Sequence, residues 1–361
     1  MIISVFHRKR VLITGHTGFK GGWLSIWLHM LGADVYGYAL APIHAQGIYN
    51  ASGIGEKIND IRGDIRDKDR LCDVFKRIEP EIVFHLAAQP IVIESYKSPA
   101  ETFEINIQGT VNLLEAIRKS DSVKATIVVT SDKCYENREW IWGYKETDPM
   151  GGSDPYSASK AAAELVTSAY RRSFFYNIGA PAIATARAGN VIGGGDWAEH
   201  RLIPDIFRAI ERGDSIKLRN PSSIRPWQHV LEPLCGYLLL ASKLLENPGE
   251  YAEAWNFGPF IQDVRDVKEI TEIIIRNLGK GNWEDISDRN KLLETNHLNL
   301  DITKAVRKLG WRPVFSLKDS IRFTSDWYMN YRKSNAFILS QKQIIEYREK
   351  YASESQRIFS S

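Results

Sequence analysis

The sequence is poor in cysteine and contains no long apolar run. Its three cysteines, Cys72, Cys134 and Cys235, are odd in number and widely spaced, which argues against a disulfide framework and a cysteine metal site. No apolar run approaches the length of a membrane span, and no signal peptide precedes the first strand-like run. We therefore expect a cytoplasmic protein with no membrane partner and no bound metal.

The sequence also has little excess charge and no repeated or low-complexity segment. Its 47 basic and 44 acidic residues leave a formal charge of +3, spread along the chain. Because a basic stripe is missing, nucleic acid is not an expected partner. The 361 residues include 43% hydrophobic ones, which is enough for one large domain or two closely joined domains.

The first half of the chain alternates short apolar runs with helical patterns. Strands are predicted at residues 10–14, 35–40, 81–86 and 124–130, and helices at residues 21–31, 102–119 and 158–170. Continuous apolar strands between helices indicate a parallel sheet that is covered on both faces. The predicted fold class is therefore α/β, with a doubly wound, Rossmann-type parallel sheet.

The pattern changes from about Asn190, where Gly193-Gly194-Gly195 and several prolines interrupt it. We expect residues 1–188 to form the sheet domain, joined by a return strand at Trp255-Asn256-Phe257 within residues 227–258. Residues 189–361 are expected to form mainly a smaller, loop-rich domain that binds the substrate. The polar tail after about Asn335 is expected to fray.

A glycine-rich turn, Gly15-His16-Thr17-Gly18-Phe19-Lys20-Gly21, follows the first strand and opens the first helix. Glycines let a backbone approach a pyrophosphate closely, and a helix N-terminus offers free N–H groups and a favourable dipole. An ordinary tight turn would also need glycine. The G-x-x-G-x-x-G spacing resembles the extended short-chain dehydrogenase/reductase family, which implies cofactor binding by Gly15, His16, Thr17, Gly18, Phe19 and Gly21.

Three later segments resemble this family in the same order, although each alone could serve packing. Residues 63–67 resemble the segment that holds the adenine, through Asp64 and Ile65. Residues 85–89 resemble the strand end beside the cofactor, and a further motif lies in the helix before the catalytic strand; these imply contacts by Leu86, Ala87, Gln89 and Asn106. Between Tyr36 and Tyr49 there is no acid, arginine or lysine, and the missing positive charge favours NAD over NADP.

Tyr156 and Lys160 lie four residues apart, so a helix would place both on one face. A free phenol, with a pKa of about 10, is a poor base at neutral pH, and a nearby ammonium lowers that pKa. Lys160 could also bind the nicotinamide ribose of the cofactor. The pair is therefore predicted to be catalytic, and the alternative is an ordinary amphipathic pair.

Thr130-Ser131-Asp132-Lys133 is expected at the end of a parallel strand, where open α/β sheets bind ligands. In the family, a Ser or Thr at the position of Ser131 bonds the reacting hydroxyl. The Asp-Lys pair that follows resembles the CDP-glucose 4,6-dehydratases, which implies that Asp132 is an acid and Lys133 a base. Both roles need unusual protonation states, which burial in a closed pocket would favour. A surface Asp-Lys dipeptide is the alternative.

Residues 188–197 and 225–230 also resemble the CDP-glucose 4,6-dehydratases. That likeness implies that Asn190 contacts the sugar or its pyrophosphate, and that Arg225 clamps the diphosphate. Trp197, Arg201 and Arg219 are further substrate-binding candidates, for which surface or packing positions remain open. The chain departs from the pattern where Ile93 replaces an arginine and His200 replaces an acid.

The resemblance implies an NAD-dependent lyase of deoxysugar biosynthesis, such as that for lipopolysaccharide O-antigen. It would convert CDP-glucose to CDP-4-dehydro-6-deoxyglucose by oxidation at C4, loss of water across C5–C6 and return of hydride to C6. The alternatives are a dehydratase of another nucleotide hexose, a 4-epimerase or reductase, and a non-catalytic NAD-binding scaffold. A homodimer or homotetramer is expected through the helices at 102–119 and 158–170, whose apolar positions would also suit buried core helices.

Overall fold

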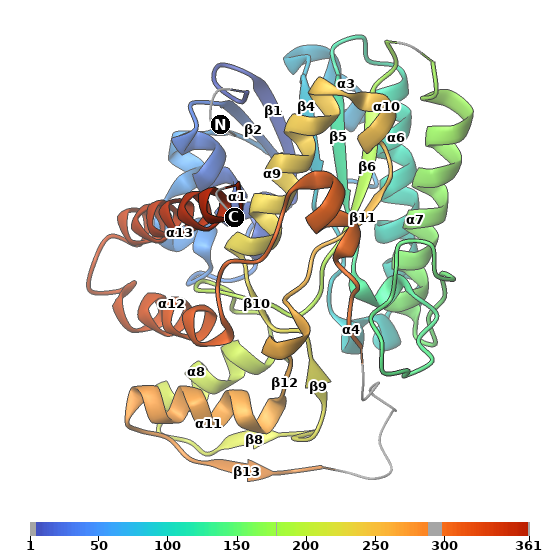
Figure 1. Ribbon diagram of the computed structural model, residues 1–361. Helices are drawn as coiled ribbons and strands as arrows, with labels where there is room; N and C mark the ends of the chain where they lie inside the picture. Colours follow the sequence, from blue (N-terminus) through green and yellow to red (C-terminus); the bar gives the residue numbers. More distant parts are fainter. Residues whose placement is uncertain (1–4, 178, 288–297, 360–361) are drawn as a thin grey trace.

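A seven-stranded parallel sheet organises the protein (Figure 1). The computed structural model describes residues 5–177, 179–287 and 298–359. The sheet has the order β11-β6-β5-β4-β1-β2-β3, and every neighbouring pair is parallel. Its strands are β1 (Arg10–Thr14), β2 (Asp34–Ala39), β3 (Asn59–Arg62), β4 (Ile82–His85), β5 (Ala125–Val129), β6 (Ala182–Arg187) and β11 (Ala254–Asn256). The order reverses between β1 and β4, which confirms the predicted doubly wound sheet.

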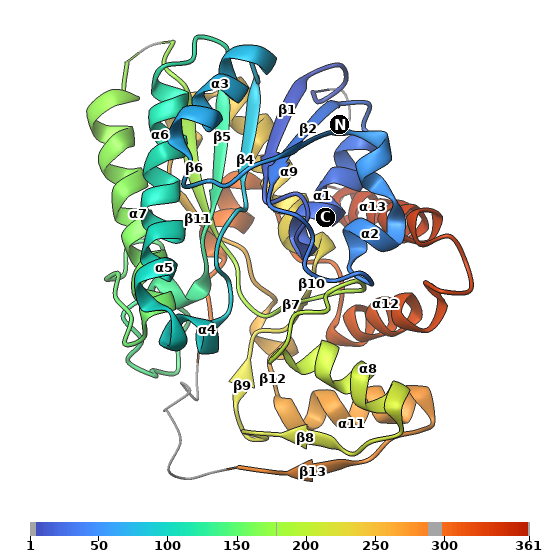
Figure 2. The same ribbon diagram turned by 180° about the vertical axis from the view of Figure 1, so that it is seen from behind.

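Helices cover both faces of this sheet (Figures 1 and 2). Leu12, Val83 and Val128 pack on one face with α3 (Lys68–Ile78) and α6 (Gly109–Arg118). Their strand neighbours Ile13, Phe84 and Ile127 point to the other face, toward α1 (Phe19–Met30) and α9 (Leu231–Glu246). Since both faces are buried, the strands are continuous apolar runs in the sequence.

Three elements of the sheet domain were not predicted, and two of them, β3 and α3, lack an apolar run in their sequences. The edge strand β3 reads Asn-Asp-Ile-Arg and is partly exposed. Helix α3 is mostly polar, but Asp67 caps it by accepting a hydrogen bond from the Arg70 N–H, a signal that the sequence contained. Strand β6 is fully buried and was also not predicted.

The two long helices of the sheet domain differ in detail from the prediction. The predicted helix at 102–119 is a continuous helical run with a π-helical turn, made of α5 (Pro99–Phe103), Glu104–Gln108 and α6. Helix α7 (Pro155–Phe174) begins three residues before the predicted start. The side chain of Asp154 caps it, and Pro155 occupies its first turn, where a missing N–H costs nothing.

The second half of the chain divides between the sheet domain and a smaller region. Helix α9 packs on β5 and β6, and β11 pairs with β6 at the position of the predicted return strand. The smaller region lies below the sheet in Figure 1, at the end where α4 (Val92–Lys97) follows β4. It contains α8 (Leu202–Arg212), α11 (Val267–Leu278) and the strand pairs β7–β10 (Val191–Ile192, Gln228–His229), β8–β13 (Ile216–Leu218, Trp283–Asp285) and β9–β12 (Ile224–Arg225, Arg265–Asp266).

Short helical segments complete the described chain. They are α2 (Ile48–Ser52), α10 (Pro248–Tyr251), 3-10 turns at Ile54–Lys57, Asp132–Cys134 and Ile261–Asp263, and a π-helical turn at Ala305–Leu309. Within the described residues, no helix is both long enough and apolar enough to cross a membrane.

The C-terminal tail was predicted to fray, and this prediction was wrong. After α12 (Leu317–Asn330), residues 336–359 form the long helix α13 (Ala336–Phe359), which packs against α1 and α2. Ile344 and Tyr347 on α13 are completely buried, and the Tyr347 ring meets the Trp27 ring edge-on at 5.7 Å. A narrow apolar stripe at helical spacing is enough to dock this polar segment.

A buried carboxyl group, that of Glu232 at the start of α9, anchors α13. Its Oε1 accepts hydrogen bonds from the N–H groups of Val314 (2.8 Å) and Phe315 (2.6 Å), and the Tyr347 hydroxyl donates to Oε2 at 2.8 Å. Burial outweighs these bonds and raises the pKa of Glu232 from 4.5 to about 7. The ionised carboxylate of Glu232 therefore lowers the free energy of unfolding. This destabilisation is absent below pH 4.5 and complete above about pH 7.

We expect Glu232→Gln to stabilise the protein in alkaline solution. Glutamine keeps the acceptor and cannot ionise, so its advantage over the wild type should grow from near zero at about pH 4.5 to at most about 3 kcal/mol above about pH 7. Urea unfolding across this range measures the difference. The control Glu346→Gln removes an exposed carboxylate on α13 that pairs with Arg322 on α12. Its difference in stability from the wild type should not grow with pH. An advantage of Glu232→Gln that is constant with pH would contradict the prediction.

Candidate active site

The glycine-rich turn lies at the carboxyl end of β1, as predicted. Gly15 has a left-handed φ of 78°, and a Cβ on Gly21 would lie 2.1 Å from the Gly15 carbonyl oxygen, so only glycine fits there. Gly18 begins α1 without a side-chain cap, which leaves N–H groups of the first turn open to a ligand. Phe19 packs toward Gly193, and the Thr17 hydroxyl bonds the Leu40 carbonyl at 3.1 Å.

His16 serves the turn as a buried structural residue. Its Nε2 lies 2.8 Å from Asp60 Oδ1, and the other carboxylate oxygen of Asp60 accepts from the Tyr49 hydroxyl (2.6 Å) and Arg62 Nη2 (2.7 Å). Burial lowers the pKa of His16, although Asp60 opposes this effect. Arg62 also donates to the Leu40 carbonyl at 3.0 Å. Strand β3 thus brings an acid and an arginine to the end of β2, where the local sequence has neither.

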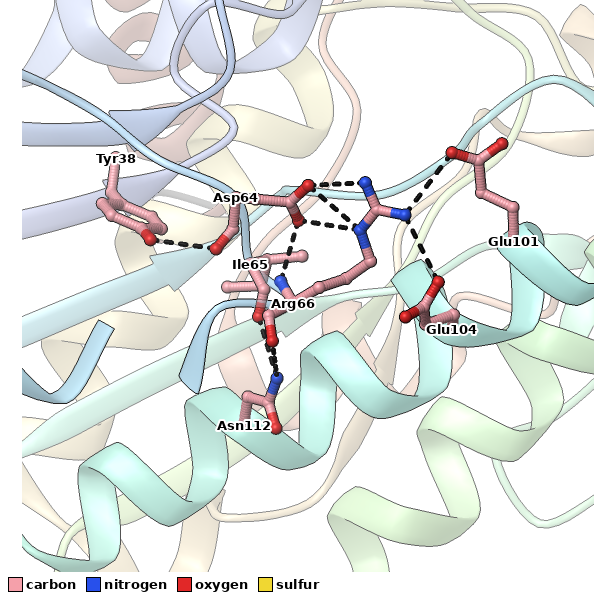
Figure 3. Close-up of polar contacts among 7 residues, drawn as sticks. All are labelled: Tyr38, Asp64, Ile65, Arg66, Glu101, Glu104 and Asn112. Carbon is pink, nitrogen blue, oxygen red and sulfur yellow. Dashed lines mark hydrogen bonds and ion pairs between the residues drawn. The ribbon is translucent and has the colours of Figure 1, made fainter. Parts of the chain in front are cut away.

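The predicted adenine-binding segment is held in place by its own polar contacts (Figure 3). The Asp64 carboxylate accepts from the Arg66 N–H (2.8 Å) and from the Arg66 guanidinium (2.6 Å), whose hydrogen bonds lower the pKa of Asp64. Arg66 also reaches Glu104 at 3.3 Å. Asn112 donates to the backbone carbonyl of Ile65 at 3.1 Å, so the segment is anchored to α6. Contact of Asp64 or Ile65 with adenine remains a prediction.

The end of β4 lies against the glycine-rich turn, and contact of Leu86 and Ala87 with the cofactor remains a prediction. A Cβ on Gly15 would lie 2.6 Å from the Ala87 nitrogen and 2.8 Å from the Leu86 carbonyl carbon. Asn106 was predicted to bind the cofactor, but its side chain is committed elsewhere. It donates to the Gln89 carbonyl (3.1 Å) and to Ser159 Oγ (2.8 Å), and it accepts from the Gln89 N–H (2.8 Å). Asn106 therefore holds the Gln89 loop against α7, because both of its donor hydrogens are used inside the protein.

The predicted catalytic residues meet at the carboxyl end of β5. Ser131 Oγ donates to Asp132 Oδ1 at 3.0 Å, and both Ser131 and Asp132 are close enough to Tyr156 to act on its pKa. Asp132 is buried, and a Cβ on Gly189 would lie 1.7 Å from its Oδ2. Lys133 follows in the same turn and is half-buried. The structure thus brings Ser131, Asp132 and Tyr156 into one connected group.

One electrostatic prediction was wrong. Lys160 was expected to lower the pKa of Tyr156, but burial raises that pKa to about 12, and the opposing groups are Ser131 and Arg201. Burial also lowers the pKa of Lys160 to about 8, against the opposite effect of Glu164. The Lys160 ammonium lies 3.5 Å from the Val129 carbonyl oxygen. Desolvation is the largest effect on both groups, and a sequence does not reveal how deeply a side chain is buried.

A buried ion pair supports this group from behind. Glu164, one turn beyond Lys160 on α7, lies 2.8 Å from Arg187 on β6, and both side chains are less than 5% exposed. Glu164 also accepts hydrogen bonds from the hydroxyls of Thr130 and Thr185. Arg187 donates to the Tyr135 hydroxyl at 2.7 Å. The pair therefore ties α7 to the ends of β5 and β6.

Lys20 belongs to the site and was not predicted. It lies in the first turn of α1, one helical turn before Trp23, whose indole donates to the Gly194 carbonyl at 2.9 Å. Burial lowers the pKa of Lys20 to about 7, and the charges of Arg201 and Asp132 act on it. The available signal was its position, because a cation in the first turn of a helix opposes the dipole.

The predicted substrate-binding residues have different surroundings. Asn190 has a left-handed φ of 47°, which is unusual outside glycine. Arg225 is buried, and Arg201 lies 2.8 Å from Asp196 at the start of α8. Trp197 is 4% exposed and packs edge-on against the Tyr328 ring at 5.1 Å. Its surroundings are those of the packing role that the sequence left open beside substrate binding. Arg219 is exposed and donates to the His200 carbonyl at 2.8 Å.

Over residues 5–177, 179–287 and 298–359, no three His, Cys, Asp or Glu side chains are arranged to bind a metal ion.

Comparison with known proteins identifies relatives along nearly the whole chain. The family model described as GDP-mannose 4,6 dehydratase matches residues 12–324. A CDP-glucose 4,6-dehydratase of Salmonella typhimurium is 46% identical over 344 residues, which cover 94% of this chain and 96% of the relative. A dTDP-glucose 4,6-dehydratase of the same organism is 26% identical, and the match covers 89% of this chain and 92% of that relative.

Solved structures agree in fold. The dTDP-glucose 4,6-dehydratase of Streptomyces venezuelae, solved with NAD bound, has a TM-score of 0.77 at 25% identity; the match covers 90% of this chain and 98% of that one. An epimerase of Methanothermobacter thermautotrophicus has a TM-score of 0.78 at 24% identity, with coverage of 92% and 97%.

We expect Glu164→Gln to destabilise the protein strongly. The substitution leaves the Arg187 charge buried and unpaired, which should cost about 3–5 kcal/mol in urea unfolding. The control Glu94→Gln, which breaks an exposed pair with Lys97, should cost less than about 1 kcal/mol. Adding Arg187→Met to Glu164→Gln should restore part of the loss. Equal effects of Glu164→Gln and Glu94→Gln would contradict the structural role of the pair.

Proposed function

This chain belongs to the GDP-mannose 4,6 dehydratase family, and on that premise we propose that it is an NAD-dependent dehydratase of CDP-glucose. The product would be CDP-4-dehydro-6-deoxyglucose. The observation that carries the proposal is the buried Tyr156–Ser131–Asp132 group at the end of β5. The choice of CDP-glucose is supported by the 46% identical relative of that name.

The residues around the glycine-rich turn suit a dinucleotide. The uncapped first turn of α1 can receive a pyrophosphate. Gly15, Gly21 and Ala87 approach one another closely, so the pyrophosphate would meet backbone atoms there and no bulky side chain. Lys160 would bind the nicotinamide ribose. When bound, NAD supplies the acceptor for the C4 hydride and returns that hydride to C6.

Tyr156 would take the proton of the sugar 4-hydroxyl. Because its pKa is raised to about 12, Tyr156 is a neutral phenol in the free protein. It must lose its own proton before it can take that of the substrate. The positive charge of Arg201 favours that loss, and the Ser131 hydroxyl stabilises the phenolate by a hydrogen bond.

Asp132 and Lys133 would remove water across C5–C6. Oxidation at C4 makes the C5 proton acidic, and Lys133 takes that proton. The C6–O bond breaks as Asp132 gives its proton to the departing hydroxyl, which leaves as water. Lys133 returns its proton to C5 when the hydride reaches C6, so the cofactor ends as it began.

The smaller region would bind the nucleotide sugar. Arg201 at the start of α8, together with Lys20 on α1, would supply positive charge for the diphosphate. Arg225 and Asn190, at the edge between the sheet domain and the smaller region, would extend this binding surface. Residues 189–361 thus supply most substrate contacts, although α9, β11 and α13 belong to the sheet domain.

We also propose that the protein is a homodimer or homotetramer and acts in deoxysugar biosynthesis for surface polysaccharides such as the O-antigen. The side chains of Phe103 and Leu165, on α5 and α7, are 37% and 60% exposed. Together they offer an apolar face for a second copy.

The substrate is tested by incubating the protein with NAD and, separately, with CDP-, dTDP-, UDP- and GDP-glucose. Mass spectrometry should show loss of one water from CDP-glucose alone, with no net reduced cofactor. Asp132→Asn should abolish water loss while NAD still binds, and Glu94→Gln should behave as the wild type. Dehydration of a different nucleotide sugar would overturn the choice of CDP-glucose. An unchanged mass with all four sugars, despite bound NAD, would overturn the dehydratase.

A further inference from the structure

Tyr237, in the second turn of α9, carries a buried hydroxyl that the proposed chemistry does not use. The residue is 0% exposed, and its ring packs edge-on against Phe257 with the centroids 5.6 Å apart. Within the described part of the chain, its hydroxyl has no hydrogen-bond partner. A buried polar group left unpaired destabilises a fold, and phenylalanine would fill the same space without that cost. The hydroxyl therefore needs an explanation in the function.

Helix α9 brings Tyr237 to the side of the sheet that carries the end of β5. The helix begins two residues after β10, which pairs with β7 near the carboxyl edge of the sheet, and it then packs along β5 and β6. Side chains on a helix lean toward its N-terminus, so Tyr237 leans toward that edge. The two ionisable groups that act on the Tyr237 hydroxyl are Asp132 and Tyr156, and together with burial they raise its pKa.

Asp132 presents the matching acceptor. Its Oδ1 is bonded by Ser131, whereas its Oδ2, which lies against the backbone of Gly189, has no partner among the described residues. A free donor and a free acceptor are thus buried in the same part of the molecule. A hydroxyl that reached Oδ2 would stabilise the carboxylate of Asp132 in addition to the bond from Ser131.

We propose that Tyr237 is a positioning residue that donates a hydrogen bond to Asp132 during the loss of water. The inference rests on the proposed function. As the C6–O bond breaks, the Asp132 proton moves to the departing oxygen, and Asp132 becomes a carboxylate. The Tyr237 O–H bond stays intact and its hydrogen bond stabilises the new charge. Oxidation at C4 precedes this step and does not need Tyr237.

Tyr237→Phe tests this role, with Thr126→Val as the matched control. Thr126, on β5, is also fully buried and has an unpartnered hydroxyl within the described chain, and valine has nearly the same shape. Both variants should keep the wild-type Tm or raise it, with KM and the Kd for NAD unchanged. Only Tyr237→Phe should lower kcat, by about 10- to 100-fold, which is the effect of one hydrogen bond to a charged group.

The near-ultraviolet absorbance of the cofactor distinguishes this role from a packing defect. Because Tyr237→Phe slows elimination and not oxidation, reduced nicotinamide should accumulate during turnover, which neither the wild type nor Thr126→Val should show. A wild-type kcat, or a fall in kcat without reduced nicotinamide, would overturn the role of Tyr237 while the wild type still dehydrates CDP-glucose. A wild type that dehydrates no sugar would instead overturn the proposed function and this inference with it.

Discussion

The geometry of the site depends on the buried ion pair between Glu164 and Arg187. A carboxylate or a guanidinium alone would be very costly at this depth, so α7 is held where Glu164 can meet Arg187 and the two threonine hydroxyls. Lys160 lies one helical turn before Glu164, and Tyr156 one turn before Lys160, so the position of Glu164 also sets theirs against β5. From Arg187 the contacts continue through Tyr135 to Asn256 on β11. Scaffold and site are thus fixed together.

Burial is the second constraint, and it prepares the site for proton transfer. Desolvation raises the pKa of Tyr156 to about 12 and lowers those of Lys160 and Lys20 to about 8 and about 7. Each shift disfavours the charged form, so the free site holds fewer charges than its side chains would carry in water. Lys160 and Lys20 can therefore change their protonation state near neutral pH at modest cost, whereas Tyr156 needs nearby positive charge to ionise.

The sequence was most informative where the signal is local. Apolar strands, the spacing of Gly15, Gly18 and Gly21, and the Tyr156–Lys160 pair are read within a few residues, and each was found where predicted. The sequence could not reveal that β3 brings Asp60 and Arg62 to the end of β2, because that contact is made by folding. For the same reason the saturated amide of Asn106 and the raised pKa of Tyr156 were missed. Helix α13 and Lys20 had local signals, a helical apolar stripe and an unfavourable first-turn cation, that were overlooked.

The proposed reaction requires the hydride that leaves C4 to return to C6 of the same sugar. It is tested most directly with CDP-glucose that carries deuterium at C4, followed by mass spectrometry and NMR of the product. We expect the deuterium to appear in the C6 methyl group, with no net reduced cofactor. Deuterium that is retained at C4, or that is lost to the solvent, would contradict it.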